Sequence, residues 1–170
     1  MSMCAERSPT RGGPVRKSFS SNVVFERISI ADTCSALCVA AGSISSSSVL
    51  ENIRFRDIDA EAFSSVVVVA GNGDTRPNGI SFENCRFRAA VSADAPLDDG
   101  EYGVLEGNPN GAVRIEKADA VAFVNCSLLW SGAEKKEFGR ALSVYDSQRP
   151  KVDGKSVLKD RVLAGAAHRE

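Results

Sequence analysis

The stretch "ISFENCRFR", residues 80 to 88, decides how the chain folds. Ile80 and Phe82 alternate with polar residues as far as Asn84, which is the pattern of a half-buried strand. At Asn84 the phase breaks, because Asn84 and Cys85 would have to exchange faces for the alternation to continue. One straight strand cannot do this. The stretch therefore predicts two short strands joined by a sharp bend at Asn84.

The same pattern occurs four times in the chain. Each copy carries a phenylalanine two residues before the bend position, and these phenylalanines are Phe25, Phe55, Phe82 and Phe123. A second apolar segment follows each copy, beginning near residues 36, 65, 111 and 140. A repeat of about 20 to 50 residues that is built only of short strands is typical of a solenoid.

Stacking of such repeats explains why they are stable. Each coil can bond its backbone to the coils above and below at about 4.8 Å, which brings equivalent side chains into columns. We predict one buried column of the four phenylalanines and a second column of the residues after the bend, which are Ile28, Ile58, Cys85 and Cys126. Cys85 and Cys126 are predicted to be buried free thiols. The bend positions hold Arg27, Asp57, Asn84 and Asn125, and Asn and Asp tolerate left-handed backbone conformations.

The repeated unit, an apolar residue followed by x-Phe-x-Asn-Cys-x-Phe, resembles the coil of the pectin-lyase-like superfamily, over about residues 21 to 146. It is most like the C-terminal coils of polygalacturonase-type glycoside hydrolases. The resemblance implies an all-β chain folded as a right-handed parallel β-helix of about four coils. The alternative is a β-sandwich with similar alternation, which would not explain four copies with the same phase break.

The repeat also predicts the division of the chain. Residues 1–20 are expected to form a flexible arm, residues 21–148 the parallel β-helix, and residues 149–170 a tail. Within the tail, "KSVLKDRVLAGAAHRE" is consistent with a short capping helix. The first 20 residues contain no apolar segment, so no secretory signal is expected there. The resemblance implies an extracellular or periplasmic protein.

Composition argues against several classes of partner. The 170 residues carry a formal charge of −1, whereas nucleic-acid and membrane-surface binding both favour a basic excess. No apolar run approaches the roughly 20 residues that span a bilayer. The five cysteines form no C-x-x-C pair and His168 is the single histidine, so neither a metal site nor a cofactor is expected.

Two insertions supply the first candidate site. Residues 91–109 and 130–139 both follow the second strand of a repeat, so they should project side by side from one corner. Long loops on one face of a solenoid usually form its binding surface. The candidates for catalysis are Asp98, Asp99 and Glu101, and the candidates for stacking on a sugar are Tyr102 and Trp130. The alternative is two solvated loops.

A strand face next to these insertions supplies the second candidate site. Pairing "AVRIE" with "ALSVY" turns Val113, Ile115, Leu142 and Val144 inward, and it turns Arg114, Glu116, Ser143 and Tyr145 outward. "GAVRIEK" partly resembles the Gly-x-Arg-Ile-Lys stretch with which polygalacturonase-like enzymes reach the substrate carboxylate. Only Arg114 carries over. Glu116 stands in place of the lysine and would repel a uronate. The alternative is a solvated Arg–Glu pair.

The catalytic motifs of that family are absent from this sequence. We find no Asn-Thr-Asp, and Gly-His-Gly is excluded because His168 is the only histidine. Two hypotheses therefore stay open. The first is a glycoside hydrolase-like protein that acts on or binds a polysaccharide, including uronate-containing ones. The second is a non-catalytic fragment or a structural or glycan-binding module, whose partners would include further coils of a larger chain or a second copy.

Overall fold

A computed structural model describes residues 18–33, 35–41, 48–62, 65–71, 75–90, 111–131 and 140–156. Within these ranges every regular element is a β-strand. The prediction of an all-β chain is therefore confirmed for the described residues. The strands form parallel ladders in stacked sheets, which is consistent with the predicted solenoid.

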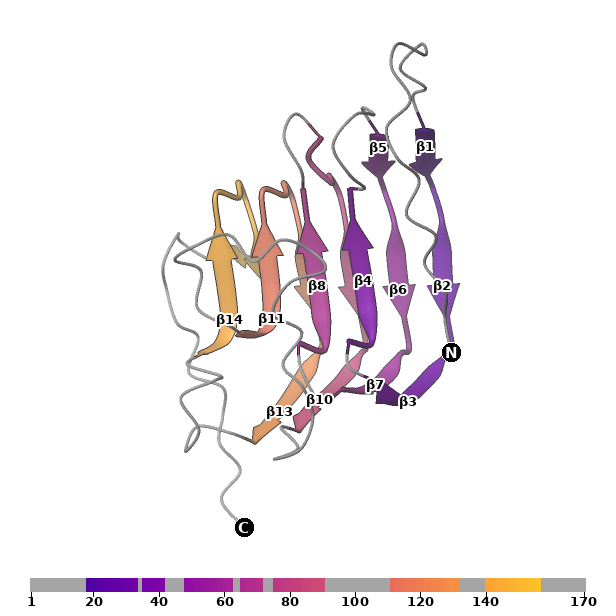
Figure 1. Ribbon diagram of the computed structural model, residues 1–170, viewed down its shortest axis with the longest axis vertical. Coiled ribbons are helices and arrows are strands. Elements are labelled where there is room, and N and C mark those ends of the chain that lie inside the picture. The colour runs from indigo at the N-terminus through magenta and orange to yellow at the C-terminus, as the bar shows by residue number, and fades with distance from the viewer. Residues whose placement is uncertain are drawn as a thin grey trace, which may run out of the picture.

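Three sheets carry most of the strands (Figure 1). The first sheet contains β2 (Val24–Glu26), β6 (Arg54–Arg56), β9 (Ser81–Glu83), β12 (Ala122–Val124), β15 (Lys151–Val152) and β16 (Lys155–Ser156). The second contains β3 (Ser29–Thr33), β7 (Asp59–Ala62), β10 (Arg86–Ala90) and β13 (Ser127–Ser131). The third contains β4 (Leu37–Ala40), β8 (Val67–Ala70), β11 (Gly111–Glu116) and β14 (Arg140–Tyr145). A further pair joins β1 (Ser18–Ser21) to β5 (Ser48–Glu51).

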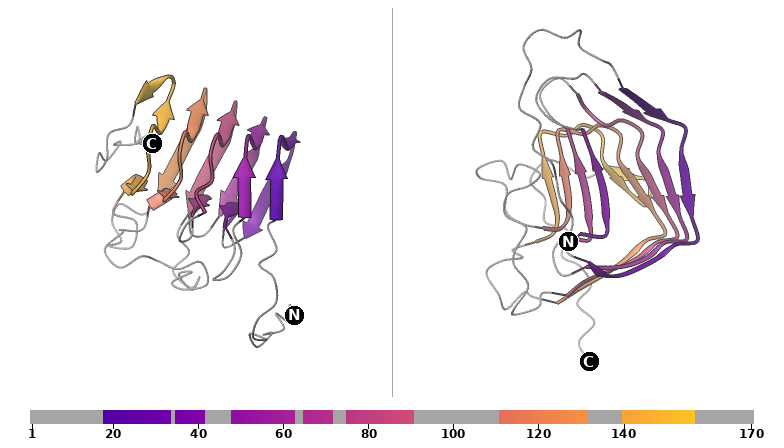
Figure 2. Two further views of the ribbon diagram at one scale, coloured as in Figure 1. Left: turned by 90° about the horizontal axis from the view of Figure 1, so that it is seen from above. Right: turned by 45° about the vertical axis from the view of Figure 1, so that its right-hand side comes forward.

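The chain runs from the first sheet to the second and then to the third, and it repeats this order along its length. Each strand pairs with its equivalent in the next repeat, and β15–β16 is the antiparallel exception among these ladders. Figure 2 shows the sheets following one another around a common interior. Contacts between residues far apart in sequence therefore build the core.

Rows of left-handed residues make corners of the stack. The corner between the first and second sheets holds Arg27, Asp57, Asn84 and Asn125, with φ between 51° and 57°, and Asp153, with a φ of 46°, is the equivalent residue in the turn from β15 to β16. Here the Asn125 side-chain amide donates to Oδ1 of Asn84 at 2.8 Å. The bend predicted at Asn84 is thus confirmed. The corner before the first sheet, which the sequence analysis did not identify, holds Asn22, Asn52, Gly79, Ala120 and Arg149, also at positive φ.

The predicted phenylalanine column is present. Ring centroids lie 5.1 Å apart for Phe25–Phe55, 5.0 Å for Phe55–Phe82 and 4.8 Å for Phe82–Phe123, with nearly parallel planes. Phe82 is fully buried, whereas Phe25 at the end of the column is 42% exposed. The column therefore fills the centre of the stack and reaches its surface at one end.

The described strands extend past the predicted domain limits. β1 includes residues assigned to the N-terminal arm, and β15 and β16 fall within the predicted tail. β15 pairs with β12, so residues 151 and 152 continue the first sheet. Residues 1–17 and 157–170, with most of the predicted capping helix, lie outside the described residues.

Candidate functional site

The two insertions are anchored on neighbouring residues. Both leave β10 and β13 at the pair Ala90↔Ser131, and both enter β11 and β14 at the pair Gly111↔Arg140. The equivalent connection from β7 to β8 is only four residues long, because β7 ends at Ala62 and β8 begins at Val67. Both insertions thus connect the second sheet to the third in adjacent layers, as the repeat predicts.

Most candidate residues of the insertions fall outside the described residues. Asp98, Asp99, Glu101 and Tyr102 all lie in the undescribed range 91–110, so their predicted roles stay predictions. Trp130, which the sequence analysis placed at the start of the second insertion, belongs instead to β13. Its backbone is paired with that of Ala89. The second insertion is therefore shorter than expected, because β13 continues to Ser131.

The strand face beside these anchors differs from the expectation in one respect. Val113, Ile115, Leu142 and Val144 belong to the hydrophobic core, which confirms the predicted inward positions. The opposite face was expected to be exposed, but three of its four residues are buried, so the alternative of a solvated Arg–Glu pair does not hold. Arg114 is 7% exposed, and Glu116 and Ser143 are 2% exposed. Tyr145 remains 38% exposed at the end of β14.

Mutual pairing is the physical reason why two charges can be buried here. Nη2 and Nε of Arg114 lie 2.7 and 3.3 Å from Oε1 of Glu116. Arg114 is in register with Val68 of β8 and Ser143 of β14, so its strand has neighbours on both sides. A buried charge is tolerated when a hydrogen-bonded partner of opposite sign compensates it.

This pairing restricts what Arg114 can bind. Two of its nitrogens already point to Glu116, and the negative Glu116 side chain is adjacent. An incoming uronate would have to compete with that carboxylate for the same guanidinium nitrogens. The buried pair is better suited to holding the strand face than to capturing an acidic sugar.

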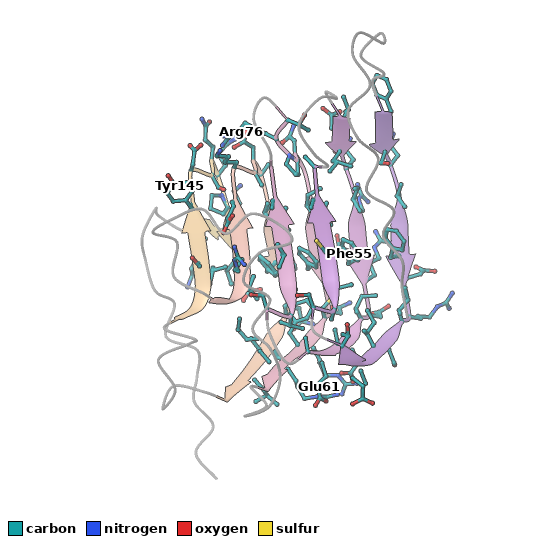
Figure 3. All side chains as sticks on the ribbon, viewed as in Figure 1. Phe55, Glu61, Arg76 and Tyr145 are labelled. Atoms are coloured by element: carbon teal, nitrogen blue, oxygen red, sulfur yellow. The ribbon has the colours of Figure 1, made fainter. Side chains whose placement is uncertain are left out.

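A second charged cluster lies at the end of the third sheet beside Tyr145 (Figure 3). Nε and Nη2 of Arg76 donate to the two carboxylate oxygens of Asp119 at 3.0 and 3.1 Å. Arg76 also contacts the backbone carbonyl of Asp146, the residue after Tyr145. The hydrogen bond from Arg76 holds the pKa of Asp119 below its ordinary value. The cluster ties three successive layers together next to the exposed tyrosine.

A shallow concavity of about 460 Å³ lies elsewhere, at the corner between the first and second sheets. Its lining is mostly polar and consists of Asp57, Ile58, Asp59, Asn84, Cys85, Arg86, Asn125, Cys126 and Ser127. The repeat pattern predicted that these residues lie at a corner, but it did not predict that they line a concave surface. The row of Asn and Asp residues at the bend was the sequence feature that could have indicated a polar surface there.

Cys85 and Cys126 line this concavity as free thiols. Cys85 is buried as predicted, whereas Cys126 is partly exposed. Their Sγ atoms contact the carbonyl oxygens of Phe55 and Phe82, at 3.7 and 3.4 Å respectively. The interaction with the neighbouring Cys126 thiol lowers the pKa of Cys85 to about 7, and the same interaction raises the pKa of Cys126.

Two other kinds of feature are absent from the described residues. They contain no group of three or more His, Cys, Asp or Glu side chains suited to a metal ion. No helix among them is long and apolar enough to cross a membrane.

The chain was compared with known protein families, curated proteins and solved structures. No protein-family model, curated protein or solved structure matches the chain.

Proposed function

We propose that the chain is a right-handed parallel β-helix of about four coils, of pectin-lyase-like architecture, that binds a glycan beside the outer face of the third sheet. The observation that carries this proposal is that the two insertions begin at paired residues and end at paired residues. They leave the second sheet at paired residues and enter the third at paired residues. Two long segments emerging from adjacent layers beside one strand face are the usual basis of a solenoid binding surface.

The residues on and around this face support a sugar as the ligand. Tyr145 presents a partly exposed ring at the end of β14. The first insertion contains a second aromatic residue, Tyr102, and three acidic residues, Asp98, Asp99 and Glu101. Aromatic rings that stack on a sugar face, combined with carboxylates that accept from its hydroxyls, are a suitable binding surface for carbohydrate.

The buried ion pair favours a neutral glycan over an acidic one. Because Glu116 occupies Arg114, Arg114 is not an unopposed cation for a uronate carboxylate. Binding alone, without hydrolysis, is the function that we propose. Hydrolysis would need two carboxyl groups separated by about 5 to 9.5 Å across the scissile bond.

The proposal is tested by measuring binding of neutral and uronate-containing oligosaccharides by calorimetry. Tyr145→Ala and Tyr102→Ala should each weaken binding of a neutral glycan by about tenfold, the effect of losing about 1.4 kcal/mol. Tyr145→Phe keeps the ring and should bind normally. Phe19→Ala, which removes an exposed aromatic ring from β1, is the matched control and should also bind normally.

Two results would overturn the proposal. One is the absence of binding to any glycan, and the other is unchanged affinity in Tyr145→Ala and Tyr102→Ala with the fold intact. Release of reducing ends during the same incubations would instead show a hydrolase. Asp98→Asn, Asp99→Asn and Glu101→Gln would then identify the carboxyl groups.

A further inference from the structure

One edge of the stack is apolar, and no described strand pairs with its outer side. Among the described strands, β2 and β3 end their sheets and pair on one side only. On this edge Phe25 is 42% exposed, Val24 48% and Phe19 of β1 68%. By contrast, Leu37 of β4, at the same end of the third sheet, is 7% exposed. The uncovered part of the edge is therefore the arc made by β1, β2 and β3, which we call the N-terminal edge.

Two of the three strands at the N-terminal edge lack the usual protection against strand pairing, because β3 carries a register shift between Ile30 and Thr33 whereas β1 and β2 pair without one. Exposed edge strands are normally guarded by lysine, proline or strong bulges. Residues 18–31 contain neither lysine nor proline. A complete layer takes about 30 residues, as the interval from Phe25 to Phe55 shows, whereas 17 residues precede β1 in the given sequence.

The backbone groups at this edge are oriented for pairing. The carbonyl of Val23 accepts from the Arg54 amide, so it points into the first sheet. Successive residues of a strand direct their backbone groups to opposite edges. The amide and carbonyl of Val24 and Glu26 therefore face the free side of β2, on either side of Phe25.

This arrangement is self-complementary about a two-fold axis. If β2 pairs antiparallel with β2 of another copy and Phe25 is at the centre, Val24 of each copy exchanges two backbone hydrogen bonds with Glu26 of the other. The two Phe25 residues then form the closer, non-hydrogen-bonded pair, with Cα atoms about 4.5 Å apart. Their rings would extend the column, whose present spacing is 4.8 to 5.1 Å.

The strands on either side of β2 fit the same symmetry. β1 precedes β2 across the corner at Asn22, and β3 follows it across the corner at Arg27. Figure 2 shows these strands on the two sides of β2 in one arc. The same two-fold axis brings β1 of each copy toward β3 of the other.

We propose that the N-terminal edge binds the N-terminal edge of a second copy of this chain, which gives a head-to-head dimer that joins the two phenylalanine columns. An isologous contact of this kind closes on itself and does not propagate into a fibre. The proposal is independent of glycan binding, which concerns the third sheet.

The test is sedimentation velocity of the full chain under reducing conditions, across the micromolar range. The wild type should be a dimer. Phe25→Asp should be a monomer, because the two-fold axis places the introduced charges opposite each other. Val24→Pro should also be a monomer, because it removes an amide that faces the free edge without removing a bond within the sheet.

Val124→Asp is the matched control, because Val124 lies in the same sheet and has the same 48% exposure as Val24. It should remain a dimer. A monomeric wild type would overturn the proposal and would leave a coil from a longer polypeptide as the occupant. Open-ended oligomers would contradict the two-fold axis. A dimer that survives in folded Val24→Pro, or that dissociates in Val124→Asp, would place the contact elsewhere.

Discussion

The two ends of the first sheet differ in how far their phenylalanine side chains are covered. At one end Phe25 of β2 is 42% exposed, and within the described part of the chain no strand pairs with the outer side of β2. At the other end Phe123 is only 6% exposed, because Val152 of β15 lies in register with it. β15 then turns back through Asp153 and Gly154 into the antiparallel β16. The phenylalanine position of the repeat is therefore buried only where a further layer covers it.

The largest expected effect comes from the middle of the column. Phe82→Ala should lower the free energy of unfolding by about 3 to 5 kcal/mol, because it leaves a cavity between two stacked rings. In the monomeric chain Phe25→Ala should cost less than half as much, because Phe25 is partly in water there. Urea denaturation of the two variants, at concentrations where the chain is monomeric, measures the difference. Equal losses would mean that Phe25 is covered as completely as Phe82.

The next largest effect is expected from the buried ion pair of the third sheet, Arg114 and Glu116. Arg114→Met should destabilise the fold by about 3 kcal/mol, because it removes a hydrogen-bonded cation from Glu116, which is 2% exposed. Replacing both residues, with Glu116→Leu added, should restore most of that loss, since both charges of the buried pair are then removed together. Thermal and urea unfolding give both values. A double variant as unstable as Arg114→Met would show that the loss does not come from burying the Glu116 charge without Arg114.

A smaller effect is expected from Asp119, whose contribution to the free energy of unfolding should decrease as the pH falls. The pKa of Asp119 is lowered in the folded state by the hydrogen bond from Arg76. A depressed folded-state pKa adds stability above the pKa of the unfolded chain, and this stability is lost as the pH falls through the folded value. Asp119→Asn should therefore lower stability by about 1 kcal/mol at neutral pH and by less in acid. If the gap between variant and wild type is the same at both pH values, the Arg76–Asp119 pair does not contribute.

The smallest effect concerns the corner at the uncovered end. Arg27 adopts a φ of 57°, where the equivalent positions hold Asp or Asn. Arg27→Asn should stabilise the chain by about 0.5 to 1 kcal/mol, because Asn tolerates the left-handed conformation better. Arg54→Asn, in the extended strand β6, is the control and should bring no gain. Destabilisation by Arg27→Asn would show that the Arg27 side chain has a role that its exposed position does not indicate.

Much of the fold could be predicted from particular residues. The phase break at Asn84 located one corner, and the recurrence of phenylalanine located the column. The other corner escaped detection because its equivalent positions include Ala120 and Arg149, so that backbone geometry rather than residue type is shared. The alternation of apolar and polar residues in β11 correctly predicted that Val113 lies on the core face and Arg114 on the opposite face. It could not predict that Arg114 is buried, because alternation tells which face a side chain is on and not what covers that face.

The candidate site was less predictable than the fold for a related reason. In a solenoid the repeat determines where insertions begin and end, and the pairs Ala90↔Ser131 and Gly111↔Arg140 follow from it. The sequence within an insertion does not repeat. No equivalent residue therefore indicates how Asp98 or Tyr102 should be placed.

The central claim is that successive repeats stack in register, and contacts between phenylalanine rings measured by nuclear magnetic resonance test it most directly. With only phenylalanine rings protonated, nuclear Overhauser effects should join Phe25 to Phe55, Phe55 to Phe82 and Phe82 to Phe123, because these centroids lie 4.8 to 5.1 Å apart. No contact should join Phe25 to Phe82 or Phe55 to Phe123, since one ring separates each pair. Contacts that skip a ring, or the absence of contacts between sequential rings, would contradict the stack.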